Sequence, residues 1–230
     1  MRRVRALLTT LAFLLPFQKL KIGLLNRLGH AIDPQALIGI NLVKSVKRVE
    51  MGPGSVIGNF NVFGRMELVR LEEGARINTF NLFVPGITME PAVDRGVTRS
   101  LIMGPHSRII FMHVIDVSGG VILGEEAWLT GMRSTILSHV FDPEGGIIIE
   151  PIELKRRAVV GTNCTLLAGA VVGEGALVGA GSTLWTRQEV AADNLAGGVP
   201  ARRLAKISIT EEAYNSLRQP APAPAPETEA

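Results

Sequence analysis

Residues 159–184 of the chain read VVGTNCTLLAGAVVGEGALVGAGSTL, a stretch that repeats every six residues. A large aliphatic residue opens each repeat: Val160, Leu166, Val172, Val178 and Leu184. Four positions after each of the first four comes a small residue: Cys164, Ala170, Ala176 and Ser182. Glycine follows three of the aliphatics directly, at positions 161, 173 and 179. The repeat predicts that one large and one small residue in every six point inward.

A period of six predicts an all-β fold, a prism-shaped parallel β-helix. An amphipathic α-helix would instead repeat its apolar residues at spacings of three and four. A chain that turns a corner every six residues has three flat sides in a coil of about 18 residues, and each aliphatic stacks on the one a coil below. Glycine permits the tight backbone of the corners.

The composition fits a β-helix and disfavours nucleic acid as a partner. The 230 residues are 47% hydrophobic but only 5% aromatic, which is enough apolar surface for one domain with short appendages. The net charge is +3, and the basic residues are scattered rather than clustered on one stripe. The single cysteine, Cys164, excludes an internal disulfide, and its inward position predicts a buried, inert thiol.

The first 35 residues form a segment of a different kind. Arginines at positions 2, 3 and 5 precede an apolar run over 6–17, and lysines follow at 19 and 21. The run is too short to span a membrane and lacks the cleavage site of an export signal. It predicts two short helices that either cap the end of the prism or, through residues 1–28, lie in a membrane interface. The sequence leaves both roles open.

The β-helix is predicted to cover residues 36–190. Interruptions of the repeat near 84–100 and 141–150 predict two loops that project from the prism. About 18 residues and 4.8 Å per coil give a prism on the order of six or seven coils. Residues 191–218 are expected to close the prism and to include a short helix with Thr210 as its N-cap, and the Pro-Ala tail, 219–230, is expected to be disordered.

The repeat, together with VIDVSGGVILG at 114–124 and STILSH at 134–139, resembles the hexapeptide-repeat acyltransferases, especially the O-acetyltransferases of polysaccharide and sugar modification. The resemblance covers about residues 36–207. It implies a left-handed β-helix, a hand that the general right-handed rule for parallel crossovers would not predict. It also implies a cytoplasmic homotrimer, peripheral at the inner membrane face if residues 1–28 bind lipid. Acetyl-CoA or another acyl-CoA would be co-substrate, without a metal.

The search for a general base is short, because the chain has four histidines: His30, His106, His113 and His139. The repeat fails from Arg133, which occupies a position where a small residue is expected, to about residue 150, and His139 lies within this interruption. In the resemblance, this segment carries the catalytic histidine. A neutral imidazole suits the removal of a proton from an alcohol that attacks a thioester, a step worth roughly 10²- to 10⁴-fold.

Two carboxylates and a second histidine complete the candidate catalytic set. Asp142 or Asp116 could accept the other ring N–H of His139 and hold its tautomer, and the sequence does not decide between them. His113, two residues before Ile115, either faces the same cleft or is a solvent-facing residue of the wall.

The coenzyme residues follow from the resemblance alone. GGVPARR at 197–203 resembles the Gly-x-Pro-Ala-basic segment that closes the coenzyme A site, where Arg202 and Arg203 would pair with phosphates. Thr162 and Ala180, one coil apart, match the wall that holds the pantetheine arm, with Trp185 and Thr186 at its corner. The match departs at Trp185 and at RQE, 187–189, where a small or hydroxyl residue and a Lys-Asp pair are usual.

Two alternatives remain beside the acyltransferase. A γ-type carbonic anhydrase needs three histidines, two of them close in sequence, whereas His106 and His113 are seven residues apart and His139 lies far downstream. A non-enzymatic, membrane-associated trimeric scaffold would use the same prism. The acceptor of an acyltransferase would be a hydroxyl of a sugar or of another small or carrier-linked molecule.

Overall fold

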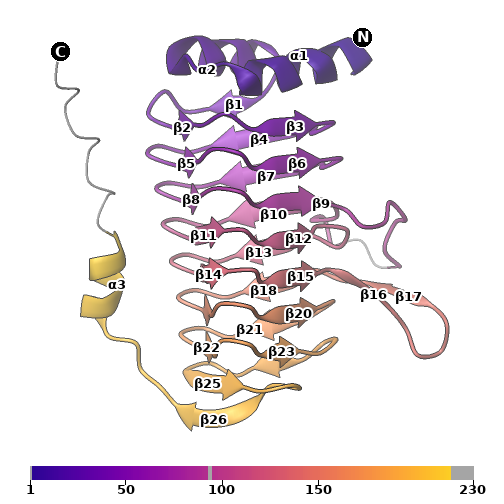
Figure 1. The fold of residues 1–230 in the computed structure, drawn as a ribbon, viewed down its shortest axis with the longest axis vertical. Coiled ribbons are helices and arrows are strands. Elements are labelled where there is room, and N and C mark those ends of the chain that lie inside the picture. Colours follow the sequence, from indigo (N-terminus) through magenta and orange to yellow (C-terminus); the bar gives the residue numbers. More distant parts are fainter. Residues whose placement is uncertain (1, 93–94, 219–230) are drawn as a thin grey trace.

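The computed structural model describes residues 2–92 and 95–218. Short strands stack into three long sheets, here called A, B and C, which form the sides of a prism (Figure 1). Sheet A contains β1 (Ala31–Ile32), β4 (Arg48–Met51), β7 (Leu68–Leu71), β10 (Ser100–Met103), β13 (Val121–Leu123), β18 (Ile152–Leu154), β21 (Val171–Val172) and β24 (Glu189–Val190).

Sheet B contains β2 (Leu37–Ile38), β5 (Val56–Ile57), β8 (Arg76–Ile77), β11 (Arg108–Phe111), β14 (Trp128–Met132), β19 (Val159–Val160), β22 (Leu177–Val178), β25 (Asn194–Gly197) and β26 (Arg202–Lys206). Sheet C contains β3 (Leu42–Lys44), β6 (Val62–Gly64), β9 (Leu82–Val84), β12 (Val114–Asp116), β15 (Thr135–Leu137), β20 (Thr165–Leu167) and β23 (Thr183–Leu184). The edges where one sheet passes into the next are called A–B, B–C and C–A.

The coil is left-handed, as the resemblance implies. From the amino-terminal end in Figure 1, the chain runs left along sheet A at the back, turns through sheet B and runs right along sheet C at the front while it descends. Sheet A has 8 strands, so the prism has about eight coils rather than the six or seven predicted. The difference arises because the first coil begins at Ala31 and because strands continue to Gly197.

The repeat fills the prism as predicted. Every aliphatic residue that opens a repeat is fully buried, and so is every small residue four positions later: Val160, Leu166, Val172, Val178, Leu184, Cys164, Ala170, Ala176 and Ser182. The coils differ in length, however. Asn41 and Asn61, stacked one coil apart, are 20 residues apart in the sequence, whereas Arg156 and Glu174 in the later coils are 18 apart. The longer coils carry an additional buried residue at the C–A edge: Val46, Met66 and Val117.

A column of polar and small side chains runs down the inside of the B–C edge. It consists of Asn41, Asn61, Asn81, His113, Ser134, Cys164 and Ser182, all buried. Side chains in this column accept hydrogen bonds from the backbone of the coil below. The N–H of Asn81 donates to Asn61 Oδ1 (2.9 Å), the N–H of His113 to Asn81 Oδ1 (3.0 Å) and the N–H of Ser134 to His113 Nδ1 (3.1 Å). The column ties successive coils together through the prism interior.

Two expectations about this edge are wrong. His113 faces neither a cleft nor solvent, because its side chain is 1% exposed and belongs to the interior column. Arg133 does not take the place of a small residue. The register between β11 and β14 shifts, so that Ser134 points inward and Arg133 adopts the left-handed corner conformation, with φ of 61°.

Two helices close the amino-terminal end of the prism. Helices α1 (Arg2–Leu14) and α2 (Gln18–Arg27) lie across the first coil (Figure 1). Their polar side chains bond to backbone groups of all three sheets: Asn26 to Ile32 in sheet A, Gln18 to Ile38 in sheet B and Thr10 to Val43 in sheet C. The amides of Asn26 and Gln18 each donate to and accept from one residue, as a neighbouring strand would. The helices therefore cap the exposed sheet edges.

The opposite end is closed by β26, which runs antiparallel to β25. The chain then returns along the prism to α3 (Glu211–Arg218), where Thr210 Oγ1 accepts the N-capping hydrogen bond from Ala213. Tyr214 anchors the helix, because its hydroxyl donates to the carbonyl oxygen of Arg157 (2.5 Å). The Pro-Ala tail at 219–230, expected to be disordered, lies outside the described residues.

Candidate active site

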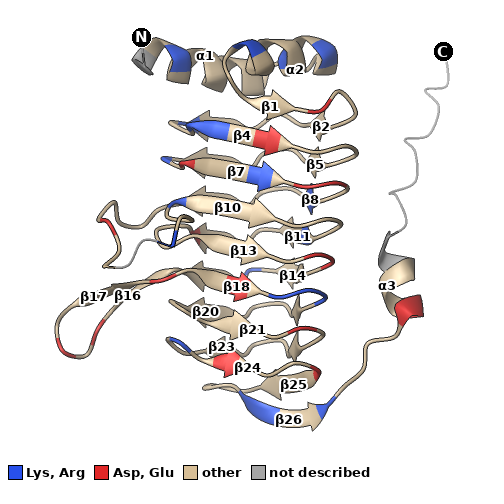
Figure 2. Ribbon diagram, turned by 180° about the vertical axis from the view of Figure 1, so that it is seen from behind, with Lys and Arg blue, Asp and Glu red and all other residues tan. Residues whose placement is uncertain are grey.

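Two excursions leave the prism at the C–A edge and flank one of its corners. Residues 85–99 connect β9 to β10, and the antiparallel hairpin of β16 (His139–Phe141) and β17 (Ile147–Ile149) lies between β15 and β18. Both project from the same side of the molecule in Figures 1 and 2. The corner between them, residues 117–120, has no room for a Cβ at Gly119 or Gly120, because Glu150 and Val97 pack against its backbone.

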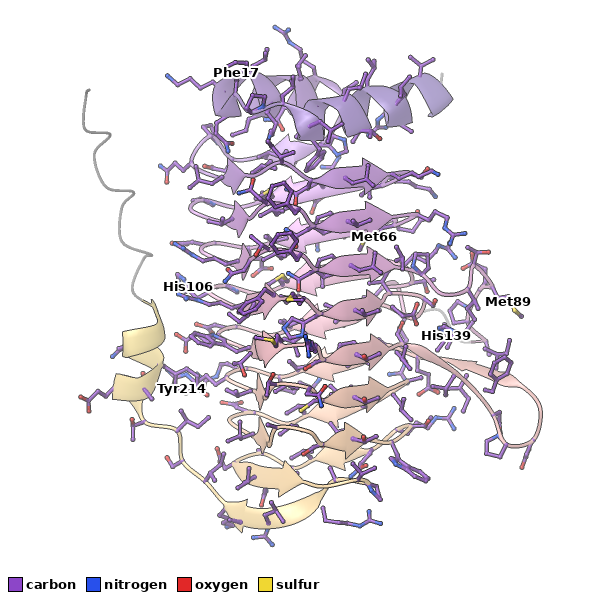
Figure 3. The ribbon with its side chains drawn as sticks, in the orientation of Figure 1. Phe17, Met66, Met89, His106, His139 and Tyr214 are labelled. Atoms are coloured by element: carbon purple, nitrogen blue, oxygen red, sulfur yellow. The ribbon has the colours of Figure 1, made fainter. Side chains whose placement is uncertain are left out.

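His139 begins the hairpin, on the side of the prism from which the excursions project (Figure 3). There it meets Asp116. The distance from His139 Nδ1 to Asp116 Oδ2 is 2.6 Å. The Asp116 carboxylate is buried at the end of β12, while the imidazole is 21% exposed. Asp142, the other carboxylate considered for this role, lies in the turn of the hairpin, where its Oδ1 accepts a hydrogen bond from the backbone N–H of Glu144 (3.0 Å).

The Asp116 carboxylate is held by donors from three directions. Its Oδ1 accepts from the backbone N–H of Gly86 (2.7 Å), the backbone N–H of Ser118 (3.0 Å) and the Ser118 hydroxyl (2.6 Å). The Ser138 hydroxyl lies 2.8 Å from the Asp116 carbonyl oxygen and accepts from the Gly119 N–H. Burial alone would raise the pKa of the Asp116 carboxyl, but the hydrogen bonds from Ser118, Gly86 and His139 outweigh burial and lower it.

An ionised Asp116 determines what His139 can do. The carboxylate accepts the Nδ1–H of the imidazole, so the lone pair of the neutral ring is on Nε2. The backbone of Gly86 lies so close to the ring that a Cβ there would collide with Cε1 of His139. The excursion at 85–99 thus supplies a hydrogen bond to the carboxylate and one wall against the imidazole. Such an arrangement of imidazole, buried carboxylate and rigid support is suited to general-base chemistry.

The expected coenzyme residues lie on two different edges. Thr162 follows β19 and Ala180 follows β22, both at the B–C edge, and Arg202 pairs with Gly197 at the lower end of the same edge. Trp185 and Thr186 follow β23 at the C–A edge instead, two coils or about 10 Å below His139. Sheet C separates the two groups, so one chain alone does not bring Trp185 and Thr186 next to Thr162 and Ala180.

Two of these side chains also have contacts within the scaffold. The Thr162 hydroxyl donates to the carbonyl oxygen of Met132 (2.9 Å) and accepts from its N–H (3.1 Å). Arg203 Nε donates to Asn194 Oδ1 (2.6 Å), whereas the side chain of Trp185 is exposed. Within 2–92 and 95–218, no group of three or more His, Cys, Asp or Glu side chains could hold a metal ion.

Sequence reasoning missed Gly86, Ser118 and Ser138 as parts of the site. Ser118 had a local signal, because a serine two residues after an aspartate commonly bonds to it. Gly86 had none, since it reaches Asp116 from the preceding coil across 30 residues of sequence.

No protein-family model matches the chain, and no curated protein matches its sequence. Solved structures do match. The polySia-specific acetyltransferase NeuO is 17% identical with a TM-score of 0.50, over 79% of this chain and 82% of that one. The N-acyltransferase AntD from Bacillus cereus, solved with dTDP and 3-hydroxybutyryl-CoA, is 16% identical with a TM-score of 0.49, over 75% and 83%.

A hexapeptide-repeat-containing acetyltransferase from Vibrio cholerae O1 biovar eltor, solved with acetyl coenzyme A, is 17% identical with a TM-score of 0.47, over 90% of this chain and 88% of that one. Identities this low say nothing of substrates. The likeness to NeuO shows that this chain shares the parallel β-helix fold of a solved acetyltransferase.

Proposed function

We propose that the protein is a coenzyme A-dependent acyltransferase that transfers an acyl group, with acetyl as the first candidate, to a hydroxyl of a sugar or of another small or carrier-linked acceptor. The observation that carries the proposal is the 2.6 Å contact between the buried Asp116 carboxylate and the partly exposed His139 imidazole. The fold shared with a solved acetyltransferase supports it.

His139 would act as general base. Its Nε2 removes the proton of the acceptor hydroxyl while the oxygen attacks the thioester carbonyl carbon. The tetrahedral intermediate then collapses, the C–S bond breaks, and the imidazolium returns the proton to the departing thiolate. Asp116 remains ionised throughout and stabilises the imidazolium, because its hydrogen bonds lower its pKa. Acyl thioester and alcohol thus become ester and thiol.

The coenzyme site would be shared between two subunits. The B–C edge with Thr162, Ala180 and Arg202 is separated from His139 by sheet C, so a second prism that presents its B–C edge to the C–A edge of the first would bring the two groups together. Such a head-to-tail contact closes into a ring when the rotation allows it, and the family resemblance favours three subunits. Trp185 and Thr186 would then face the same cleft from the subunit that carries His139.

The surface of the B–C edge supports such a contact. Phe60 and Phe80 are 57% and 58% exposed, and their rings stack at a centroid distance of 5.3 Å. Ile40, Met112 and Met132 continue the exposed apolar stripe along the same edge. A stripe of this length is uncommon on a monomeric protein and typical of a subunit interface.

The test is coenzyme release from acetyl-CoA in the presence of a panel of sugars. We expect thiol release by the wild type and a fall in kcat of at least about 10²-fold for His139→Ala, with the melting temperature and the native mass unchanged. His106→Ala is the matched control, because His106 is an exposed histidine on the A–B edge (Figure 3). If the wild type shows no thiol release and no thermal stabilisation by coenzyme, the proposal is overturned in favour of a non-enzymatic scaffold.

The shared site has a test of its own. Ala180 is exposed, so Ala180→Trp should block the coenzyme edge without unfolding the prism. Co-expressed His139→Ala and Ala180→Trp chains should regain activity that neither has alone, because mixed assemblies contain sites with both edges intact. No recovery in a confirmed mixed assembly would place the whole site within one subunit.

A further inference from the structure

The cap helices α1 and α2 have an apolar face that nothing in the described chain covers. Their inner face is buried against the prism by Ala12, Phe13, Ile22 and Leu25. The opposite face is formed by seven large apolar residues, each at least 43% exposed: Val4, Leu7, Leu8, Leu11, Leu14, Phe17 and Leu20. Figure 3 shows Phe17 on the side of the helices that points away from the prism. We call these seven residues the outer cap face.

The charge around the outer cap face has one sign. The first 32 residues contain six lysines and arginines and no aspartate or glutamate. Figure 2 accordingly shows blue and no red on α1 and α2. Lys21 is turned inward, where its Nζ donates to the carbonyl oxygens of Ile38 (2.8 Å) and Gly39 (2.6 Å), but Lys19 and Arg27 are exposed on α2.

We propose that the outer cap face docks the protein on an anionic lipid bilayer. An amphipathic helix with a continuous apolar face and cations beside it lies in the plane of the interface, with its apolar side chains at the boundary between headgroups and acyl chains. Cations near an anionic leaflet add attraction that salt screens. None of the helices described in the structure is long and apolar enough to cross a membrane, so the contact is peripheral.

Two features favour lipid over a second copy of the chain. A cap-to-cap dimer would bring the positive charges of two caps together with no carboxylate on either helix to balance them. The inner face of the cap is already committed to the first coil through Gln18 and Asn26, so lipid binding requires no unfolding. The docking surface is independent of the proposed acyl transfer, because it lies at the end of the prism and His139 lies on its side.

The experiment is flotation of the full chain with vesicles. We expect the protein to float with vesicles of equal parts phosphatidylcholine and phosphatidylglycerol, to remain behind with pure phosphatidylcholine, and to dissociate as salt is raised. Leu7→Gln with Leu11→Gln should weaken binding about tenfold or more, because two apolar side chains leave the interface. Lys19→Gln with Arg27→Gln should weaken it about tenfold at low salt.

Matched variants on the prism wall separate this from a general change in polarity or charge. Leu37→Gln with Leu42→Gln alters two leucines of similar exposure on sheets B and C, and Arg133→Gln with Lys206→Gln removes two exposed cations far from the cap. Both control pairs should float like the wild type. The proposal is overturned if the wild type does not float, if the Leu7 and Leu11 variant floats like it, or if that variant instead lowers the native mass.

Discussion

The first five coils of the prism and the last three differ in length and in filling. Apart from the coil that carries the excursion at 85–99, coils up to β15 take 20 or 21 residues, as the stacked asparagines and the pair of His113 and Ser134 show. Their interior holds phenylalanine and methionine, such as Phe63 and Phe83 with ring centroids 4.8 Å apart. From β18 onward a coil takes 18 residues, as Glu153 opposite Val171 shows, and the interior is aliphatic. The hairpin that carries His139 lies where the two parts meet.

The extra length of the early coils enters at the C–A edge, and the candidate site occupies that edge. Val117 fills the additional interior space, and Asp116, directly before it, turns into the corner with Ser118. In the later coils the same edge is a tight turn, such as the one at Gly169 with φ of 75°. A longer coil therefore provides the room in which a carboxylate can be buried with all its hydrogen bonds made.

The strongest test of this junction is Asp116→Asn. The amide keeps the size of the carboxylate but cannot hold the Nδ1–H tautomer as an anion or stabilise the imidazolium, so kcat should fall about 10³- to 10⁴-fold, as for the equivalent change in serine protease triads. Steady-state kinetics over a range of pH measure it. Asp142→Asn is the control, because that carboxylate lies in the hairpin turn, away from the His139 ring, and should change kcat less than about threefold.

Equal losses in the two variants would contradict the assignment of Asp116. A loss confined to Asp142→Asn would transfer the orienting role to the hairpin, and would imply that the hairpin moves before the reaction.

The later coils were predictable from the sequence and the early coils only in part. Regular hexapeptides repeat every corner, so Val160 and Ala170 could be placed inward by counting. In the early coils two extra residues per coil shift the six-residue repeat, and one further residue shifts the register between β11 and β14. Counting in sixes therefore misplaced His113 and Arg133.

The site could be predicted as residues but not as a set of contacts. His139 stood out because the repeat fails around it, yet the choice between Asp116 and Asp142 depends on which coil corner faces the hairpin. Which corner faces the hairpin depends on how the coils stack in space, and separation along the sequence does not reveal it. Gly86 enters the site for the same reason, from the coil before Asp116.

A second test compares the interior columns of the two parts through Asn61→Ala. Asn61 Oδ1 accepts from the Asn81 N–H (2.9 Å), and its Nδ2 donates to the carbonyl oxygen of Asn78 (2.8 Å). Alanine leaves both buried groups unpaired and opens a small cavity, so the free energy of unfolding should fall by about 3 kcal/mol. Denaturant unfolding measures it.

Cys164→Ala is the counterpart in the later coils. Cys164 belongs to the same column. Its N–H donates to Ser134 Oγ (3.1 Å), a bond that alanine retains, and its thiol makes only a weak hydrogen bond to the carbonyl oxygen of Gly179 (3.2 Å). The loss should be about 1 kcal/mol or less. Similar losses at both positions would mean that the hydrogen bonds of the Asn61 side-chain amide add nothing to the free energy of unfolding beyond the volume that the side chain fills.

A smaller effect than that of Asn61→Ala concerns His113, the titratable member of this column. Burial lowers the pKa of His113 to about 4. Between that value and the ordinary pKa near 6.5 the unfolded chain binds a proton that the native chain does not, so the free energy of unfolding falls as the pH falls. At about pH 5 this one group costs about 2 kcal/mol relative to neutral pH.

His113→Asn should remove that cost. The position follows Asn81 in the column, so an asparagine Oδ1 can replace Nδ1 as acceptor for the Ser134 N–H, as Asn61 Oδ1 does for Asn81. Urea unfolding at about pH 5 and about pH 7.5 should show the variant losing about 2 kcal/mol less than the wild type between the two. His30, whose pKa burial also lowers to about 4, keeps its own share of the acid sensitivity, so the slope should shrink rather than vanish. An unchanged slope would mean that His113 stays neutral in the unfolded chain as well, or takes up its proton inside the prism.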